Sequence, residues 1–362
     1  MKTVYVGLSG GVDSSVSAAL LKEQGYKVIG VYMKNWTKNL PGFDCPWKED
    51  FQDAKRVAVQ LGIDFKVFDF ETQYKQKVVD YMIAEYKVGR TPNPDIMCNQ
   101  EIKFKLFLQT ALEDGADLVA TGHYARVKDG QLLTAKDSNK DQTYFLYRVT
   151  TDALQKTLFP LGDYTKPEVR ALAQKYGLIT ASKKESMGIC FVGKVGIKDF
   201  LGQYVDTKSG SIIDQNGSRV GEHDGAIFYT IGQRSGLGVG GGLPYYVVGK
   251  DMVKNEVYVT TDLNDKRLWS NQLYLTDVHW INQVPVDATV QVRTRHRAPL
   301  IEGTLDLAFS TPDMASYGGG TLNVKLKDDI RALTPGQSAV LYQGKYVVGG
   351  GIICKLKNYQ LY

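Results

Sequence analysis

The chain has 362 residues, more than one hydrophobic core usually contains, so we expect two or three domains. With 43% hydrophobic and 23% charged residues it has the composition of a globular protein, and no apolar run is long enough to span a membrane, which excludes disordered and membrane-spanning chains. The net charge of +5 permits a nucleic-acid partner only where positive charge gathers locally.

The first predicted element is a strand that leads into a glycine-rich turn. Val4, Val6 and Leu8 alternate with other residues, which is typical of a strand. From Asp13 onward the apolar positions follow helical spacing, up to a stop at Gly25. Because the strand begins almost at the N-terminus, it leaves no room for a signal or transit peptide, and we expect a cytoplasmic protein.

The turn between this strand and helix has the composition of an anion site. Gly10 and Gly11 let the backbone approach an anion, and Ser9, Ser14 and Ser15 add hydroxyl donors at the positive end of the helix. The turn is neither a Walker loop nor a GxGxxG dinucleotide fingerprint, so most kinases and dehydrogenases are excluded. A nucleotide phosphate fits there, and a tight turn without a ligand is the alternative.

The next elements predict a parallel sheet covered by helices. Strands are expected over residues 27–33, 65–68 and 117–122, and helices over residues 51–61 and 72–88. The carboxyl ends of parallel strands line the ligand crevice of such a sheet, so Met33 is a candidate wall for an adenine. A core methionine is the alternative. Gly122 and His123 follow the last strand into the same crevice, where His123 either binds a phosphate or base or is a satisfied loop histidine.

A proline-rich loop precedes the first notable cysteine. Pro92 and Pro94 are expected to forbid a helix, which then starts near Asn99 and runs to Glu113. Cys98 would lie beside the helix N-terminus, where the dipole lowers the pKa of its thiol. A reactive cysteine and a small buried hydrophobe are both consistent with this position.

The second notable cysteine, Cys190, follows a helix predicted over residues 166–176. Gly188 and the apolar flank indicate a turn or strand end, and nothing local decides whether this thiol reacts. Together with Cys45 and Cys354, the cysteines are too few for a disulfide scaffold, and they form no CxxC pair that would suggest zinc.

Two polar features lie between the cysteines. Asp129 and Gly130 predict a hairpin between residues 125–127 and 132–134. The polar stretch that follows is expected to cap a short aromatic helix. In it Lys140 and Gln142 can donate to phosphates or base edges, and a solvated cap is the alternative.

From about Gly193 onward, short strands and glycine turns replace the helices and indicate new domains. Residues 228–234 and 245–248 predict a strand pair joined by a mobile glycine loop, which either covers a crevice or partner or is simply flexible. Residues 271–362 suit a small β-barrel.

Within the predicted barrel, residues 290–297 alternate between apolar and basic side chains. Arg293, Arg295 and Arg297 would then project from one face of a strand. Three such arginines repel one another unless phosphates neutralise them, and an RNA backbone is the natural counterion. An edge strand protected by its charge is the alternative.

Three motifs together strongly resemble the tRNA-specific 2-thiouridylase family. They are SGGVDS at residues 9–14, NPDIMCN at residues 93–99 and GICF at residues 188–191. The first motif is shared with guanylate, argininosuccinate and asparagine synthetases, and the cysteine motifs narrow the choice. The similarity continues through GQR at 232–234, TRHR at 294–297 and TPGQ at 334–337, so it covers essentially the whole chain.

The resemblance implies an α/β fold followed by two β-rich domains. It implies a doubly wound parallel sheet of the PP-loop ATP pyrophosphatase type over residues 1–195, a small central β-rich domain over 196–270, and a C-terminal β-barrel with tRNA contacts over 271–362.

The activity that the resemblance implies is a tRNA-uridine 2-sulfurtransferase that uses ATP and Mg²⁺ and forms AMP and pyrophosphate. A uracil oxygen is a poor leaving group, so the C2 oxygen of the wobble uridine would first become an AMP ester. Sulfur would come from a cysteine desulfurase or sulfur-relay protein. Neither DNA nor a membrane is an expected partner.

The resemblance also implies roles for single residues. Cys190 would carry the sulfur as a persulfide, Cys98 would be the paired nucleophile, and Asp95 would fit a general acid or base. Whether the terminal sulfur attacks directly or leaves as free sulfide stays open, and both routes leave a Cys98–Cys190 disulfide to be reduced. The residues expected at the nucleotide are Gly7, Leu8, Ser9, Gly10, Gly11, Val12, Asp13, Ser14, Met33 and Gly122.

In the family pattern a further set of positions contacts tRNA. The expected contacts are Asn93, Pro94, Asp95, His123, Lys140, Asp141, Gln142, Arg295, His296 and Gln337. Asn93 to Asp95 would meet the target base, which must leave its stack. His296 stands where a tyrosine is common in the family. Asp13 would take part in binding magnesium and phosphate, and no dedicated set of metal-ligating side chains is expected.

Two other functions compete with this one. A guanylate-synthetase-like ligase would need neither cysteine, but no glutaminase module accompanies the chain. A tRNA-binding protein with a degenerate nucleotide site is the second, and the complete glycine turn argues against it.

Overall fold

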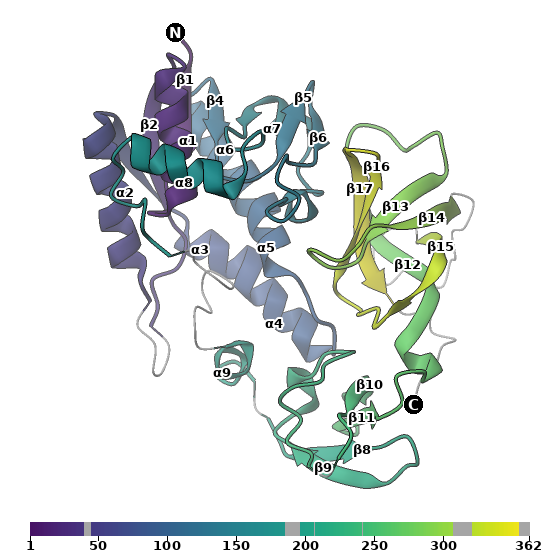
Figure 1. Ribbon diagram of the computed structural model, residues 1–362. Helices are drawn as coiled ribbons and strands as arrows, with labels where there is room; N and C mark the ends of the chain where they lie inside the picture. The colour runs from purple at the N-terminus through teal and green to yellow at the C-terminus, as the bar shows by residue number, and fades with distance from the viewer. Residues whose placement is uncertain (40–44, 185–195, 206, 241, 307–320, 355–362) are drawn as a thin grey trace.

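The computed structural model describes residues 1–39, 45–184, 196–205, 207–240, 242–306 and 321–354. Figure 1 shows three parts: a helix-covered sheet at the upper left, a small sheet at the bottom and a barrel at the right. Within the described residues, no helix combines the length and apolar character that crossing a bilayer requires.

The N-terminal domain contains a five-stranded sheet in the order β3-β2-β1-β4-β7, with every neighbouring pair parallel. Its strands are β1 (Thr3–Gly7), β2 (Lys27–Lys34), β3 (Asp64–Asp69), β4 (Leu118–Ala120) and β7 (Thr157–Leu158). Val4 and Val6 pack with α1 (Val12–Glu23) and α2 (Trp47–Leu61), whereas Tyr5 belongs to the cluster on the opposite face. Helices therefore cover both faces, which confirms the predicted doubly wound sheet.

The helices on the Tyr5 face include two long ones with π-helical middles. The first comprises α3 (Glu71–Tyr74), a π-helical stretch (Lys75–Val79) and α4 (Asp80–Lys87). The second comprises α5 (Pro94–Met97), a π-helical stretch (Cys98–Leu106) and α6 (Phe107–Glu113). The shorter helices are α7 (Thr151–Gln155), α8 (Lys166–Lys175) and α9 (Ile197–Leu201).

The expectation that an extended loop runs up to Cys98 is wrong. The helix begins at Pro94, four residues earlier, with Asn93 as its N-cap. Proline is well suited to the first helical position, because its fixed φ is helical and its missing N–H would have no helical partner. Cys98 therefore lies in the second turn of a continuous helix and not in front of it.

The central sheet has the order β10-β11-β8-β9, with β11 and β8 parallel and the other pairs antiparallel. Its strands are β8 (Gly210–Ile213), β9 (Arg219–His223), β10 (Tyr246–Asp251) and β11 (Glu256–Thr260). The predicted strand at 228–234 is wrong. A short 3₁₀ turn (Ala226–Phe228) leads into irregular chain with Gly232 at φ +81°. Gly232 N and the Gln233 carbonyl bond to Val247 of β10, but no longer ladder forms.

The C-terminal domain is a closed, six-stranded antiparallel barrel, as predicted. Strand β12 pairs with both β15 and β17, which closes the order β12-β15-β14-β13-β16-β17. Its strands are β12 (Trp269–Trp280), β13 (Thr289–Arg293), β14 (Ile301–Asp306), β15 (Leu322–Arg331), β16 (Ser338–Gln343) and β17 (Tyr346–Cys354). Leu273, Leu275, Val290 and Val292 fill its interior.

The row of three arginines does not form on this barrel. Strand β13 ends at Arg293, and the chain then turns, with Arg297 at φ +64°. A residue in that conformation cannot continue the alternation of a strand. Arg293, Arg295 and Arg297 therefore do not share one strand face.

The N-terminal domain also contributes to the barrel sheet. The hairpin predicted around Asp129 and Gly130 forms β5 (Arg126–Lys128) and β6 (Gln131–Leu133), and β6 pairs with β17. Figure 1 shows this hairpin beside the barrel. The hairpin ties the barrel to the domain that bears the glycine turn.

Candidate active site

The glycine turn between β1 and α1, residues 8–11, is built by close backbone packing. Gly10 has φ +74°, and a Cβ there would collide with the backbone oxygen of Asp50 on α2. At Gly122, just beyond β4, a Cβ would lie 2.8 Å from the backbone nitrogen of Ser14. A side chain at position 10 would push α2 away from the turn, and one at position 122 would push the end of β4 away from the start of α1. Both positions therefore require glycine.

Two of the three serines in this region form hydrogen bonds with the backbone of the turn. Ser14 Oγ donates to the Gly11 carbonyl at 3.1 Å and accepts from Ser9 N at 3.2 Å, and Ser15 Oγ donates to the same carbonyl at 2.8 Å. Ser14 and Ser15 are buried, whereas Ser9 is exposed. That all three serines add hydroxyl donors for an anion stays a prediction. In the structure the hydroxyls of Ser14 and Ser15 donate to the Gly11 carbonyl, as hydroxyls in a first helical turn can.

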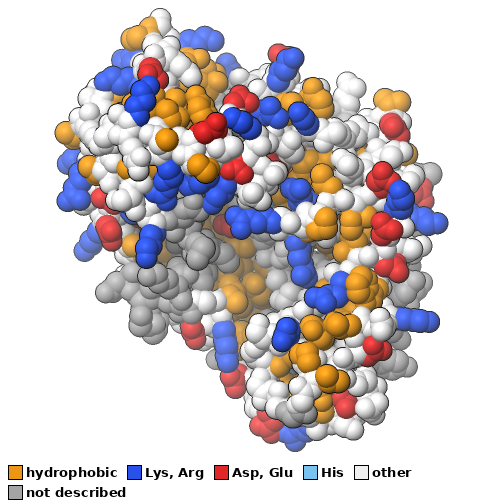
Figure 2. All heavy atoms as spheres, viewed as in Figure 1, with side chains coloured by type: hydrophobic (Ala, Val, Ile, Leu, Met, Phe, Trp, Pro, Cys, Tyr) orange, Lys and Arg blue, Asp and Glu red, His pale blue; other side chains and the backbone are white. Residues whose placement is uncertain are grey.

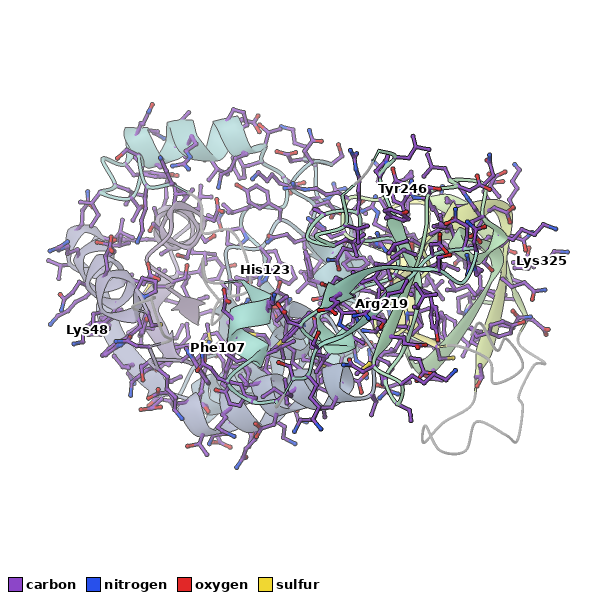
Figure 3. The ribbon with its side chains drawn as sticks, turned by 90° about the horizontal axis from the view of Figure 1, so that it is seen from below. Lys48, Phe107, His123, Arg219, Tyr246 and Lys325 are labelled. Carbon is purple, nitrogen blue, oxygen red and sulfur yellow. The ribbon has the colours of Figure 1, made fainter. Side chains whose placement is uncertain are left out.

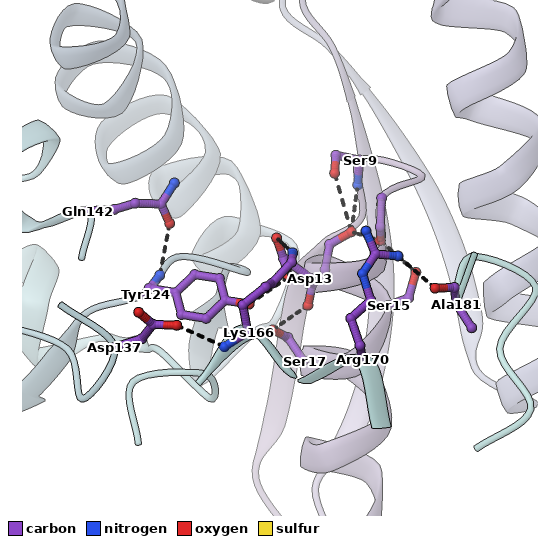
Figure 4. Close-up of polar contacts among 12 residues, drawn as sticks. Ser9, Asp13, Ser15, Ser17, Tyr124, Asp137, Gln142, Lys166, Arg170 and Ala181 are labelled. Atoms are coloured by element: carbon purple, nitrogen blue, oxygen red, sulfur yellow. Dashed lines mark hydrogen bonds and ion pairs between the residues drawn. The ribbon is translucent and has the colours of Figure 1, made fainter. Parts of the chain in front are cut away.

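The first turn of α1 carries an ion pair that the sequence did not indicate. Lys166 Nζ, at the start of α8, lies 2.6 and 2.8 Å from the carboxylate oxygens of Asp13, and the Tyr124 hydroxyl donates to Asp13 Oδ1 at 2.9 Å (Figure 4). No side chain of the described residues caps α1, whose N-cap is Gly11. The uncapped N–H groups and the nearby cation make the turn suitable for an anion.

The end of β2 lies beside the end of β1, just before the glycine turn. The terminal Cε of Met33 lies 2.9 Å from the position that a Cβ on Gly7 would occupy. Two residues further, the Oδ1 atom of Asn35 is buried without a hydrogen-bond partner among the described residues. Sequence reasoning missed Asn35, although its place just beyond a parallel strand could have indicated it.

Asp95 and Cys98 lie three residues apart on the helix that begins at Pro94, so they are neighbours on its surface. Cys98 is buried. Burial raises the pKa of the Asp95 carboxyl, and the charge of Lys103 partly opposes this shift. Asp95 is thus suited to hold a proton and to donate it, as a general acid does.

Cys190 lies outside the described residues, and so its position relative to Cys98 is not part of the structure described. The described chain ends before it at Lys184. Lys183 Nζ binds Asp50 Oδ1 at 2.9 Å and Asp53 Oδ2 at 2.7 Å on α2. Because Asp50 packs on Gly10, the chain that leads towards Cys190 starts beside the glycine turn.

The chain matches three family models in succession. They are described as the tRNA methyl transferase HUP domain (residues 2–194), the tRNA methyl transferase PRC-barrel domain (198–261) and the aminomethyltransferase β-barrel domain (270–353). The tRNA-specific 2-thiouridylase MnmA of Enterococcus faecalis is 45% identical, and that of Listeria monocytogenes serotype 4a is 47% identical. Each match covers 97% of this chain and 94% of the relative. The chain belongs to the tRNA-specific 2-thiouridylase family.

Among solved structures, a 4-thiouridine synthetase in complex with RNA and ATP is similar at a TM-score of 0.38 and 17% identity. The match covers 56% of this chain and 50% of that chain.

Among the positions expected to contact tRNA in the 2-thiouridylase family, His123 is one of the buried ones. Its Nδ1 lies 2.8 Å from Thr121 Oγ1, and its ring packs against Phe104 and Phe159. Burial lowers the pKa of His123 well below its usual value, so the ring is neutral at pH 7. Figure 3 shows it inside the N-terminal domain, whereas Lys48 and Lys325 lie at opposite edges of the molecule. These contacts are those of a satisfied interior histidine.

The polar stretch around Asp141 holds the domains together. Asp141 is buried, accepts from Thr143 Oγ1 at 2.8 Å, and lies 3.3 Å from Arg293 Nη1 of the barrel. Gln142 Oε1 accepts from Tyr124 N at 2.9 Å, and Lys140 is half-buried. Arg293 is thus neutralised by a carboxylate of this protein and not by a phosphate.

His296 lies over an aromatic pair next to the Cys98 helix. Its ring centroid is 4.6 Å from that of Phe145 and 6.2 Å from that of Tyr144. The Phe145 carbonyl accepts from Asn99 Nδ2 at 3.0 Å. Burial, with Arg297 and Arg293 nearby, lowers the pKa of His296 to about 4, so the ring is neutral at pH 7. A neutral imidazole that packs on two aromatic side chains is a suitable surface for a nucleobase to stack on.

The remaining expected contacts lie where the three domains meet. Arg295 and Gln337 help line a cavity of about 320 Å³ between the central loop and the barrel, and both bond to backbone carbonyls. In Figure 2 lysine and arginine side chains border the hollow between the N-terminal domain and the β-rich part. Asn93 and the buried Pro94 start the Cys98 helix near this junction.

Proposed function

We propose that this chain is an ATP-dependent sulfurtransferase that thiolates C2 of the wobble uridine of tRNA, with domains at residues 1–195, 196–270 and 271–362. The observation that supports it most is the identity of 45–47% to relatives that bear the name tRNA-specific 2-thiouridylase, over 97% of the chain. The intact glycine turn, with its fitted backbone, supports an active nucleotide site and not a degenerate one.

We propose that the glycine turn holds the phosphates of ATP. Backbone N–H groups of residues 10–14 and the exposed Ser9 hydroxyl would bind them, while Met33 and Gly122 would border the adenosine. The described residues contain no group of three His, Cys, Asp or Glu side chains that could hold a metal. Mg²⁺ therefore fits as an ion held mainly by phosphate oxygens, with Asp13 as its protein ligand, and it would neutralise phosphate charge there.

The reaction that we propose exchanges one oxygen for one sulfur. Uridine O2 bonds to the α-phosphorus of ATP and pyrophosphate leaves, which turns a poor leaving group into AMP. The terminal sulfur of a persulfide on Cys190, supplied by a cysteine desulfurase or relay protein, then replaces that oxygen at C2. A Cys98 thiolate takes over the bond to Cys190, and a reductant restores both thiols from the resulting disulfide.

Asp95 and the start of the Cys98 helix would serve the target base directly. Asn93, Pro94 and Asp95 would contact the flipped uracil, with Asp95 protonated so that it can donate to the base or leaving oxygen. His296, Lys140 and Gln142 would contact the neighbouring tRNA. The buried His123 and Asp141 would support those contacts from behind.

A reconstituted assay tests the proposal. The purified chain is incubated with unmodified tRNA transcript, ATP, Mg²⁺ and a persulfide-donating cysteine desulfurase, and the tRNA nucleosides are analysed by mass spectrometry. We expect 2-thiouridine with the wild-type chain and with Cys45→Ser, whose cysteine is half-exposed. Thiolation should fall below 1% with Cys98→Ser, while ATP binding persists. Full thiolation by Cys98→Ser, or none by the wild type, would contradict the proposal.

A further inference from the structure

The connection between α4 and α5 is bonded to both other domains through Thr91. Its N–H donates to the Pro335 carbonyl at 2.9 Å, and its carbonyl accepts from Gln337 Nε2 at 2.8 Å. Its Oγ1 lies 3.1 Å from Thr230 Oγ1 of the central domain. All three polar atoms of Thr91 thus meet a partner from another domain.

The barrel turn at Pro335 and Gly336 packs closely against Thr91. Gly336 has φ +92°, and a Cβ there would lie 2.8 Å from Thr91 N. Behind it, Arg295 Nη2 donates to the Ala332 carbonyl at 2.8 Å and to Thr334 Oγ1 at 2.9 Å, and it reaches the Ile231 carbonyl at 3.3 Å. Residues of the sequence motifs at 232–234, 294–297 and 334–337 line the same cavity here.

We propose that Gln337, backed by Arg295, is a positioning residue that sets where the Cys98 helix stands. One amide nitrogen of Gln337 donates to two successive carbonyls, those of Thr91 and Pro92, at 2.8 and 3.3 Å. The helix that presents Asp95 and Cys98 begins two residues later at Pro94. This inference rests on the proposed function for what the helix does.

The position of the Cys98 helix matters because the proposed reaction depends on short distances between the reacting atoms. Reacting atoms must approach within about 3–3.5 Å, and a displacement of about 1 Å can lower a rate 100-fold. The two thiols and an activated base must meet, while the tRNA is expected to contact the barrel as well as the N-terminal domain. The hydrogen bonds from Gln337 to the residues just before the Cys98 helix would fix the distance between the barrel and this helix. A tRNA group that accepts a hydrogen bond from this nitrogen would have to displace it from one of the two carbonyls.

The test compares two glutamines of the barrel. Gln337→Glu keeps the size but turns the donor into an acceptor that faces two carbonyls. Gln343→Glu is the matched control, since Gln343 Nε2 also donates to two carbonyls, those of Asp287 and Thr289, both at 3.2 Å and both in the barrel. The measurements are the single-turnover thiolation rate at saturating tRNA, the Kd for tRNA, and the rate of Cys98 alkylation by iodoacetamide, followed by peptide mass spectrometry without tRNA.

We expect Gln337→Glu to slow thiolation 10- to 100-fold and to accelerate Cys98 alkylation at least fivefold, with the Kd for tRNA within threefold of wild type. Gln343→Glu should stay within twofold in all three. A tenfold weaker Kd, with the saturated rate and the alkylation unchanged, would make Gln337 a tRNA contact and overturn the inference.

A second variant covers the case in which Gln337→Glu does not fold. Thr91→Val removes only the hydroxyl contact to Thr230, and it should shift the thiolation and alkylation rates in the same directions by a smaller factor. Unchanged rates would again overturn the inference. If the wild-type chain does not thiolate tRNA, the proposed function fails, whereas the alkylation experiment still decides whether Gln337 positions the helix.

Discussion

Lys166 at the start of α8 forms an ion pair with Asp13 in the first turn of α1, with Nζ 2.6 and 2.8 Å from the two carboxylate oxygens. The lysine side chain is only 11% exposed, so water screens this pair weakly. Without the pair, the carboxylate would place an uncompensated negative charge where we propose that phosphates bind. Lys166 therefore joins α8 to the electrostatics of the proposed nucleotide site.

Lys166→Met should weaken ATP binding at least tenfold, about 1.4 kcal/mol, because the charge of Asp13 would then repel the phosphates. The matched control is Lys175→Met on the same helix, whose ion pair with Glu23 at 3.6 Å is exposed. The control should leave the affinity within twofold. Isothermal titration with ATP alone, without the Mg²⁺ that Asp13 is proposed to bind, measures both, and an unchanged Kd for Lys166→Met would show that the pair has no role in nucleotide binding.

Gly122→Ala should damage the same site by displacing backbone. The added Cβ would lie 2.8 Å from Ser14 N, so β4 and α1 would have to separate, at a cost of about 1–3 kcal/mol in unfolding free energy. Gly240→Ala is the control, since a Cβ there meets nothing within 4 Å. Urea unfolding and ATP titration check both effects. Wild-type stability and ATP affinity in Gly122→Ala would contradict the packing described.

Asp95→Asn should raise stability at pH 7 while it abolishes thiolation. Burial raises the pKa of Asp95 in the folded chain above its usual 3.8, so the folded state binds the proton more tightly than the unfolded state. Stability is then lost as the pH rises from that usual value through the folded pKa. The variant lacks this loss, and its advantage over wild type should vanish below about pH 3.8. An advantage that does not change with pH would contradict the assignment.

Asp141→Asn should destabilise the protein by roughly 3 kcal/mol, because it leaves the guanidinium of Arg293 largely buried without its carboxylate. Asp163→Asn is the control, since Asp163 pairs with Arg126 but its side chain is 77% exposed, and its cost should stay below about 0.5 kcal/mol. Urea unfolding monitored by circular dichroism measures both. Equal losses in the two variants would contradict a buried structural role for Asp141.

The elements that local sequence determines were predictable. The alternation before Leu8, the glycines at positions 10 and 11 and the helical spacing after Asp13 together predicted the first strand, turn and helix, and Asp129-Gly130 predicted the hairpin. Each depends on the backbone preferences of a few adjacent residues.

The errors have a different physical origin. Pro94 was expected to break a helix, but proline at a first helical position starts one. The alternation at 290–297 was read as one strand, but Arg297 adopts a positive φ, and Asp141, 152 residues before Arg293, neutralises that arginine. Pairing of β6 with β17 and of Lys166 with Asp13 likewise depends on contacts between distant segments, which local periodicity does not encode.

The most direct test of the account follows the oxygen that leaves the uridine. A tRNA with ¹⁸O at C2 of the wobble uridine is thiolated by the purified chain with ATP, Mg²⁺ and the persulfide donor, and the AMP is analysed by mass spectrometry. We predict one ¹⁸O in each AMP formed per 2-thiouridine. Unlabelled AMP with the label in water, or thiolation without AMP, would contradict activation of the C2 oxygen by ATP.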